Sequence, residues 1–273
     1  MSETATLSGL FIYPVKSARG IAQEHVRLTP LGLEWDRQWM IVDERGVFLT
    51  QRTHPQLARL VPRIEADALV LAAPELSELR VPLDAAGGAL EVTIWADRVR
   101  AMTQGPHTDE WLSWAVGQPV RLVRVAQAMG RHANPKYAGS PPAPISFPDG
   151  YPILVCNTAS LDDLNTRLPA PIPMERFRPN LVLEGLPPWA EDRIDTLCFE
   201  GLTLKLVKPS VRCSIPSLDH VTGASSIDPL PVLKRFRFSR ELRGVTFGEN
   251  AVIAQDRAGE LRRGASAEIS WRT

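Results

Sequence analysis

The stretch "LTLKLVKPSVRC", Leu202 to Cys213, sets the character of the second half of the chain. Its three leucines alternate with polar residues, which is the period-two pattern of a half-buried β-strand, and we expect that strand to end at Lys208. Pro209 has no N–H to donate to a neighbouring strand, so it should terminate the pairing. Cys213 then lies in a polar loop directly after an arginine, where a packed thiol would gain little.

Short apolar or alternating runs like this one recur along the chain, broken by glycine and proline. They predict strands over 7–15, 35–52, 68–74, 90–102, 151–157, 180–185, 196–201, 251–255 and 267–271. The 24 prolines favour many loops and edge strands over long helices. The sequence therefore predicts an α+β fold that is rich in strands, with a small β-barrel or folded-over sheet in its second half.

Three short helices are expected between these strands. They are residues 108–117, which end at a glycine; 158–169, with Thr158 or Ser160 as the cap; and a helix from the Asp228–Pro229 pair to about Arg237. A proline- and glycine-rich stretch without periodicity, 129–151, predicts a loop with no further element, which joins two lobes. A chain of 273 residues is long enough for two.

Composition excludes several classes of protein. Acidic and basic residues number 31 each, so the chain lacks the strong basic field of a nucleic-acid-binding protein. No apolar run approaches the roughly 20 residues that span a bilayer, so no membrane partner is expected. The three cysteines, an odd number with scattered spacing, argue against a disulfide framework and favour a reducing cytoplasm.

A metal site made only of protein ligands is also not expected. The chain contains no GxxxxGK[ST], GxGxxG, CxxC or HExxH string, and its five histidines show no ligand spacing. Cys156 and Cys198 lie inside apolar strands, where a cysteine behaves as a small hydrophobic residue. Cys213 follows Arg212 and is close to Lys208, and such positive charge favours the thiolate, which is both a nucleophile and a soft metal ligand. An incidental loop cysteine remains the alternative.

Three other segments place cationic or hydroxyl groups at strand ends. Lys16 and Ser17 follow a strand in "YPVKSARG", and Arg37 lies between two tryptophans in "EWDRQW". In "RFRPN", the ring of Pro179 is expected to hold Arg178 extended. Each segment alone also fits a solvated loop or a structural ion pair. Together they form a set of arginine, lysine and hydroxyl groups that can donate paired hydrogen bonds to a phosphate and to a polar heterocycle.

The ordered set of strings resembles the MOSC family (molybdenum cofactor sulfurase C-terminal domain) with its N-terminal β-barrel-like domain. The strings are "YPVKSARG", "WDRQW", "DGYP", "NTASLDDLN", "RFRPN", Glu191-Asp192, Arg212-Cys213 with Asp219 beyond it, and "FGEN". They span nearly the whole chain, and within the family they are similar to the amidoxime-reducing component and its bacterial counterparts. The resemblance implies a smaller N-terminal β-rich lobe over 1–126, a connecting loop over 127–150, and a MOSC β-barrel lobe over 151–273.

The resemblance also implies one molybdenum–molybdopterin cofactor (Mo-MPT) per chain. Its dithiolene would hold the metal, and Cys213 would be the only protein ligand and the catalytic residue. The residues that match the pterin- and phosphate-binding positions are Lys16, Ser17, Arg37, Arg178, Asn180 and Arg212, and the loop around Gly150 and Tyr151 would line the same cleft. Two departures affect the surroundings of the cysteine: Val211 stands where relatives often have serine, and "SIPS" where close relatives carry threonines.

Two functions follow from different uses of Cys213. The first is a molybdenum-dependent oxidoreductase that reduces N-hydroxylated compounds such as amidoximes, hydroxylamines and N-hydroxylated bases. Because the chain shows no redox centre of its own, a separate ferredoxin-type or flavin-type reductase would supply electrons. The second is a carrier, in which Cys213 holds a persulfide and delivers sulfur, or in which the protein carries the molybdenum cofactor to another enzyme.

Overall fold

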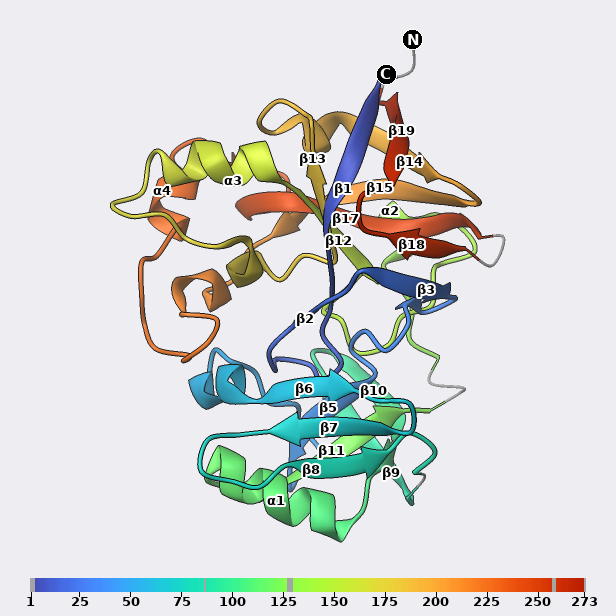
Figure 1. Ribbon diagram of the computed structural model, residues 1–273, viewed down its shortest axis with the longest axis vertical. Coiled ribbons are helices and arrows are strands. Elements are labelled where there is room, and N and C mark those ends of the chain that lie inside the picture. Colours follow the sequence, from blue (N-terminus) through green and yellow to red (C-terminus); the bar gives the residue numbers. More distant parts are fainter. Residues whose placement is uncertain (1–2, 86, 127–129, 257–258, 273) are drawn as a thin grey trace.

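The computed structural model describes residues 3–85, 87–126, 130–256 and 259–272. It has a larger lobe that contains most of the second half of the chain and a smaller lobe made from the first half (Figure 1). The first residues of the expected connecting loop, 127–129, lie outside the described residues. The domain boundaries themselves stay a prediction.

The larger lobe is a closed seven-stranded barrel in the order β12–β13–β1–β19–β14–β15–β17, with β17 returning to β12. Its strands are β1 (Thr4–Ile12), β12 (Ile153–Asn157), β13 (Leu181–Glu184), β14 (Ile194–Phe199), β15 (Leu202–Val211), β17 (Gly244–Asp256) and β19 (Ser266–Trp271). Two short strands extend the same sheet, β2 (Ile21–Ala22) on β1 and β16 (Phe238–Ser239) on β17. The expected barrel is thereby confirmed.

The leucines of β15 explain why this sheet closes. Leu202, Leu204 and Leu206 are at most 3% exposed and pack in one cluster with residues of β1, β12, β13, β14 and β19. Alternation places all these side chains on one face, and closing the sheet buries that face completely. The strand β1 belongs to this cluster although it comes from the N-terminus, so the barrel is completed by the first residues of the chain.

Pro209 does not end its strand as expected. β15 continues to Val211, because the pairing with β17 shifts register between Leu206 and Lys208 and again between Pro209 and Val211. The two shifts leave Val207 and Ser210 without a partner in the register, so Pro209 lies between two interruptions of the pairing, where a proline is tolerated inside a sheet. The cysteine loop therefore begins later, and Arg212 still bonds the barrel through its backbone N–H to Val245.

Helices cover one side of the barrel. They are α3 (Thr158–Asn165), α4 (Leu230–Lys234), η2 (Met174–Phe177), η3 (Ala190–Arg193) and η4 (Ile215–Ser217). The cap of α3 is Asn157, not Thr158 or Ser160, because the hydroxyl of Ser160 is buried and bonds Glu191 and Trp189. α4 ends three residues before Arg237, since Phe238 already pairs in β16.

The smaller lobe contains two sheets and one helix. Strands β5 (Trp39–Asp43), β11 (Val120–Val125), β10 (Asp97–Thr103) and β9 (Ala89–Ile94) form the first, and β6 (Val61–Ile64), β7 (Ala68–Ala72) and β8 (Leu79–Pro82) the second. The helix α1 (Pro106–Val116) packs below them (Figure 1), and η1 (Pro55–Arg59) precedes β6. The expected helix is confirmed; it begins two residues earlier, with a proline in its first turn, and ends at Gly117 with φ 83°.

Two further pieces join the lobes. A three-stranded sheet pairs β3 (His25–Thr29) with β18 (Glu260–Arg262) and β4 (Gly32–Leu33). The loop between the lobes contains one helical turn, α2 (Pro135–Ala138), which the sequence did not indicate; Asn134 caps it. Phe147 anchors the loop because it is fully buried in the core of the smaller lobe.

Candidate cofactor site

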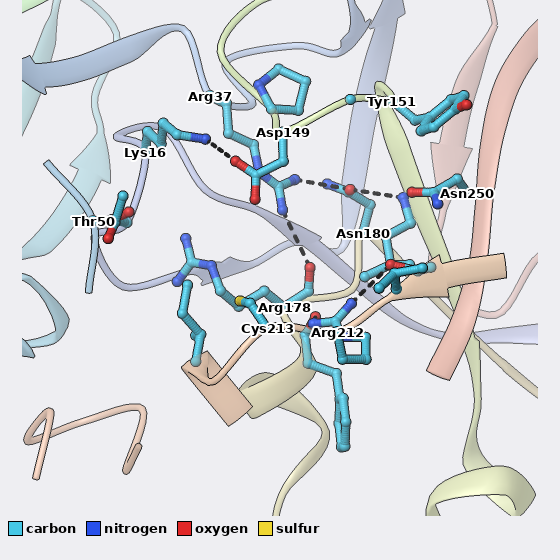
Figure 2. Close-up of a pocket in the computed structure, with 18 of the residues that line it drawn as sticks. Lys16, Arg37, Thr50, Asp149, Tyr151, Arg178, Asn180, Arg212, Cys213 and Asn250 are labelled. Atoms are coloured by element: carbon cyan, nitrogen blue, oxygen red, sulfur yellow. Dashed lines mark hydrogen bonds and ion pairs between the residues drawn. The ribbon is translucent and has the colours of Figure 1, made fainter. Parts of the chain in front are cut away.

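A cavity of about 310 Å³ lies where the two lobes meet. All nine residues singled out from the sequence line it: Lys16, Ser17, Arg37, Gly150, Tyr151, Arg178, Asn180, Arg212 and Cys213. In Figure 2, side chains from the smaller lobe, the connecting loop and the ends of the barrel strands converge; those labelled include Lys16, Arg37, Tyr151, Arg178, Asn180, Arg212 and Cys213. Residues separated by almost 200 positions are therefore neighbours in one site.

The smaller lobe contributes Lys16 and Ser17. The backbone N–H of Lys16 donates to Trp39 at 2.8 Å, and Gln51 donates to the carbonyl of Ser17 at 2.7 Å, so the turn that carries both residues is fixed. The ammonium of Lys16 donates to the carbonyl of Phe147 and forms an ion pair with Asp149. Lys16 is only 6% exposed, and burial lowers the pKa of its ammonium.

Two guanidinium groups enclose the ring of Tyr13. Arg37 lies 4.4 Å and Arg178 4.2 Å from the ring centroid, which is a favourable cation–π geometry. Arg37 also forms an ion pair with buried Asp36 at 2.6 Å, and Arg178 donates to the carbonyl of Ala18 at 2.7 Å. Burial lowers the pKa of the Arg178 guanidinium to about 10, and the charge of Arg37 acts in the same direction. The two arginines are thus held rigidly beside each other despite their like charge.

The backbone at Arg178 differs from the expectation. Its φ of 56° and ψ of 48° are left-handed rather than extended, because it is the residue that ends η2 and its N–H donates to Glu175. Ser17 and Arg37 on the same cavity also have positive φ. Residues other than glycine seldom adopt this conformation. Such backbone strain often marks a site whose side chains must point in fixed directions.

Asn180 acts inside the wall of the cavity. Its side-chain oxygen accepts from Arg37 at 2.9 Å and from the N–H of Leu154 at 3.1 Å, while its amide donates to Phe11 at 3.2 Å. It is 1% exposed. These contacts connect β1 with β12 and orient Arg37. Asn180 therefore contributes to the site by holding the guanidinium of Arg37 in position.

Cys213 follows β15 and lies on the cavity wall, partly exposed. The other two cysteines are placed differently. Cys156 is fully buried against the α3 side of the barrel, and burial raises the pKa of its thiol above the ordinary range. Cys198 is half-exposed on β14 beside Thr203, which corrects the expectation of a core position: its strand alternates, and Leu197 is the residue that faces the core.

Sequence reasoning missed several residues that line the cavity. Arg52 stacks on Trp95, with its guanidinium 4.5 Å from the ring, and the ammonium of Lys208 lies 4.9 Å from the ring of Tyr137. Thr50, Asp149, Ser210 and Asn250 complete the polar lining. Asp149 and Asn250 belong to the strings "DGYP" and "FGEN", so the signal for them was already in the sequence. Arg52 had no such signal.

The charges of the cavity do not balance. Lys16, Arg37, Arg52, Arg178, Lys208 and Arg212 line it, and Asp149 is the carboxylate among the lining residues. Lys16 pairs with Asp149 and Arg37 with Asp36. The other four cations have no carboxylate partner within the part of the chain that the structure describes. The excess of positive charge predicts an anionic ligand, which would repay the cost of desolvating these cations.

Comparison with known proteins assigns the chain to a family. The sequence profile of the MOSC N-terminal beta barrel domain matches residues 4–119, and that of the MOSC domain matches residues 142–268. Mitochondrial amidoxime reducing component 2 of Rattus norvegicus is 31% identical over 249 residues, which cover 87% of this chain and 74% of the rat protein. The chain belongs to the MOSC family. Both MOSC lobes therefore contribute side chains to the cavity.

Two further relatives carry informative names. Mitochondrial amidoxime-reducing component 1 of Homo sapiens is 29% identical over 266 residues, with 93% of this chain and 79% of the human protein covered. Molybdenum cofactor sulfurase of Danio rerio is 29% identical over 265 residues, which cover 90% of this chain and 31% of the zebrafish protein.

Among the described residues, no helix has the length and apolar character needed to cross a membrane.

The lining of the cavity is compatible with the molybdenum cofactor, with which the MOSC family is associated. The Nε of Arg212 and the hydroxyl of Tyr151 are buried, lack a hydrogen-bond partner and belong to residues that line the cavity. Such atoms are costly unless a ligand satisfies them. Within the described part of the chain, no group of three or more histidine, cysteine, aspartate and glutamate side chains could hold a metal ion alone.

Proposed function

We propose that this MOSC protein is a molybdenum-dependent reductase of N-hydroxylated compounds such as amidoximes, hydroxylamines and N-hydroxylated bases. The observation that carries the proposal is the partly exposed thiol of Cys213 on the wall of a cavity with excess positive charge. The names of the mammalian relatives, amidoxime-reducing components, supply the substrate class. The excess of cations that line the cavity favours this function over a sulfur carrier, for which one accessible thiol would suffice.

The cofactor would be one molybdenum–molybdopterin per chain. The unpaired guanidinium groups of Arg178 and Arg212 are suited to its phosphate and pterin oxygens, since a planar fork binds such groups with two hydrogen bonds. Lys16 and the neighbouring Ser17 would contact it from the smaller lobe. The loop of Gly150 and Tyr151 would cover it. The thiolate of Cys213 would be the protein's single ligand to the metal.

The bound cofactor would supply two-electron chemistry at the metal. The overall reaction cleaves the N–O bond of the substrate: two electrons and two protons enter, the nitrogen takes up one of the protons, and the oxygen leaves with the other as water. The chain's own contribution is to hold the cofactor, to orient the substrate beside Cys213 and to surround both with fixed charge. Arg52 and Lys208 lie on the cavity lining outside the predicted cofactor set, where they would face the substrate.

Electrons would come from a separate protein. The sequence contains no CxxC string, no flavin fingerprint and three cysteines, which are too few for an ordinary iron–sulfur cluster. A ferredoxin-type or flavin-type reductase is therefore the partner that we propose. The cytoplasmic location expected from the three free cysteines stays a prediction.

The test is turnover of benzamidoxime by the purified, cofactor-loaded protein. With reduced methyl viologen as electron donor, we expect benzamidine to form at a rate proportional to the amount of protein. With NADH or NADPH alone, we expect none. If viologen-driven turnover is absent although molybdenum and pterin are bound, the reductase proposal is wrong.

A further inference from the structure

A strongly basic segment next to the cavity has no role in the site described above. It is "KRFRFSRELR", Lys234 to Arg243, which runs from the end of α4 through β16 to the start of β17. Lys234, Arg235, Arg240 and Arg243 are exposed, together with Phe236 (38%) and Phe238 (47%). Phe236 packs edge-on against Trp189 and beneath the guanidinium of Arg167, so Phe238 is the more open of the two aromatic side chains.

Four exposed cations are clustered in this segment. Elsewhere, Arg63, Arg80 and Arg262 form ion pairs with nearby carboxylates, whereas Arg59 and Arg100 are exposed singly and have no ion pair among the described residues. Over the described ranges, none of the four exposed cations in 234–243 has an ion pair. Arg237 is the exception within the segment: it points inward and forms a bidentate pair with Asp192. With four exposed cations and one exposed carboxylate, Glu241, the surface of the segment carries a net positive charge although the whole chain is neutral.

The segment is fixed in place. Phe238 pairs with Val245, and the turn that follows is closed by the N–H of Leu242, which donates to Ser239 at 3.1 Å. Arg243 has a φ of 52°, so the turn has a defined conformation. Phe238 is therefore presented by a rigid hairpin, which lowers the entropic cost of binding.

The same hairpin is a direct neighbour of the cysteine loop. The carbonyl of Val245 accepts from the N–H of Arg212 at 2.8 Å, so Phe238 lies two strands away from the residue before Cys213, which is about 10 Å. Val211, 41% exposed, lines the cavity and lies against Gly244 at the end of the turn. The basic hairpin and the cavity therefore share a rim.

We infer that this basic hairpin, with Val211, is the docking surface for an acidic electron-transfer protein. The inference rests on the proposed function and adds the location and the sign of charge of the partner surface. An apolar centre surrounded by charge fits a small, transient interface, and opposite charges raise its association rate. A nucleic acid or an anionic membrane would also be attracted by four cations, but neither needs a place beside the cavity, whereas an electron donor does.

The test compares two electron donors in charge-reversal variants of the cofactor-loaded protein. The variant is Arg240→Glu/Arg243→Glu, and the control with equal charge change is Arg262→Glu/Arg263→Glu. Arg262 and Arg263 are 67% and 54% exposed and belong to β18 and the turn after it, on the other side of the larger lobe from α4 (Figure 1). The donors are reduced methyl viologen and an acidic plant-type [2Fe–2S] ferredoxin kept reduced by its NADPH-dependent reductase.

At low salt, we expect the Arg240→Glu/Arg243→Glu variant to lose about tenfold in ferredoxin-driven turnover and to keep viologen-driven turnover within about twofold. Added salt should slow ferredoxin-driven turnover of the wild type more than that of this variant. The control should resemble the wild type in both assays. Equal ferredoxin rates in all three proteins would overturn the inference, as would a parallel loss in both assays.

Two controls separate the alternatives. Failure of wild-type turnover with viologen would reject the proposed function, whereas normal viologen turnover with unaffected ferredoxin coupling would reject the docking surface alone. Binding to phosphatidylserine vesicles or to a single-stranded RNA that depends on Arg240 and Arg243, with unchanged ferredoxin coupling, would assign the hairpin to a membrane or a nucleic acid and would contradict the inference.

Discussion

Ionisable side chains are wholly or partly buried in two regions, the cavity between the lobes and the η3 side of the barrel. The two regions differ in how the charges of these side chains are compensated. At the cavity, Arg178 and Arg212 have no carboxylate partner within the described residues. Where η3 packs against β12 and β17, the buried acid Glu249 pairs with Arg272 at 2.9 Å, and Glu191 accepts from Ser160 at 2.7 Å. Burial raises the pKa of these two carboxyls, to about 8 and about 7 respectively.

This difference distinguishes ionisable groups that serve the fold from ionisable groups that are suited to bind a ligand. A buried acid can reduce its cost by taking up a proton, although one carboxyl oxygen of Glu191 and one of Glu249 lack a hydrogen-bond partner among the described residues. A guanidinium stays charged at neutral pH and cannot do the same. Arg178 and Arg212 donate to carbonyl and hydroxyl groups of the protein, but a counter-charge for them would have to come from a bound anion. The predictions below test this contrast.

The largest expected effect is the difference in reductase activity between the Cys213→Ser and Cys156→Ala proteins. Loss of the thiolate ligand should abolish reduction of benzamidoxime with reduced methyl viologen, since a neutral hydroxyl is a poor ligand for a soft site. Cys156→Ala removes a buried thiol that does not line the cavity and should keep activity at a stability cost of about 1 kcal/mol. Near wild-type turnover by the Cys213→Ser protein would refute the assignment of the ligand.

The next effect contrasts two arginines. Arg178→Ala should lower the molybdenum content per chain at least about tenfold and change the melting temperature of cofactor-free protein little, because the removed cation has no carboxylate partner. Arg237→Ala should keep the molybdenum content and destabilise the cofactor-free protein by about 3 kcal/mol, because it leaves Asp192 unpaired. The measurements are the molybdenum content per chain and the melting temperature of the cofactor-free protein for both variants. The reverse pattern would show that Arg178 is structural.

The smallest effect concerns pH. Because the folded-state pKa of Glu191 is raised from 4.5 to about 7, this carboxyl stabilises the fold most below about pH 4.5, and the contribution is lost as the pH rises through 7. The loss is roughly 3 kcal/mol at most. Glu191→Gln should therefore have a flatter free energy of unfolding between pH 5.5 and 8.5 than the wild type. Equal pH dependence of the two proteins would contradict the raised pKa.

Local pattern predicted much of the fold. Alternating leucines identified β15 and its neighbours, and the glycine at 117 identified the end of α1. The same reasoning could not show that β1 completes a barrel made mostly by the second half, because strand pairing over about 180 residues leaves no local signal. It also placed the end of β15 too early, since the sequence does not reveal the bulges that accommodate Pro209.

The site was predictable as a set of residues but not as a geometry. Family strings gave all nine predicted residues, and all nine line one cavity. The left-handed backbone at Arg178 was missed because the rule for residues before proline ignores the end of η2. Arg52 was missed because its position depends on stacking against Trp95, which is distant in sequence.

The most direct test of the account is the molybdenum and pterin content of the protein purified from a host that makes the cofactor. The account predicts about one molybdenum and one phosphorylated pterin per chain, both lost in Cys213→Ser/Arg178→Ala/Arg212→Ala protein that still folds. Metal-free and pterin-free wild-type protein with a cyanide-labile sulfur on Cys213 would contradict it and would identify a sulfur carrier.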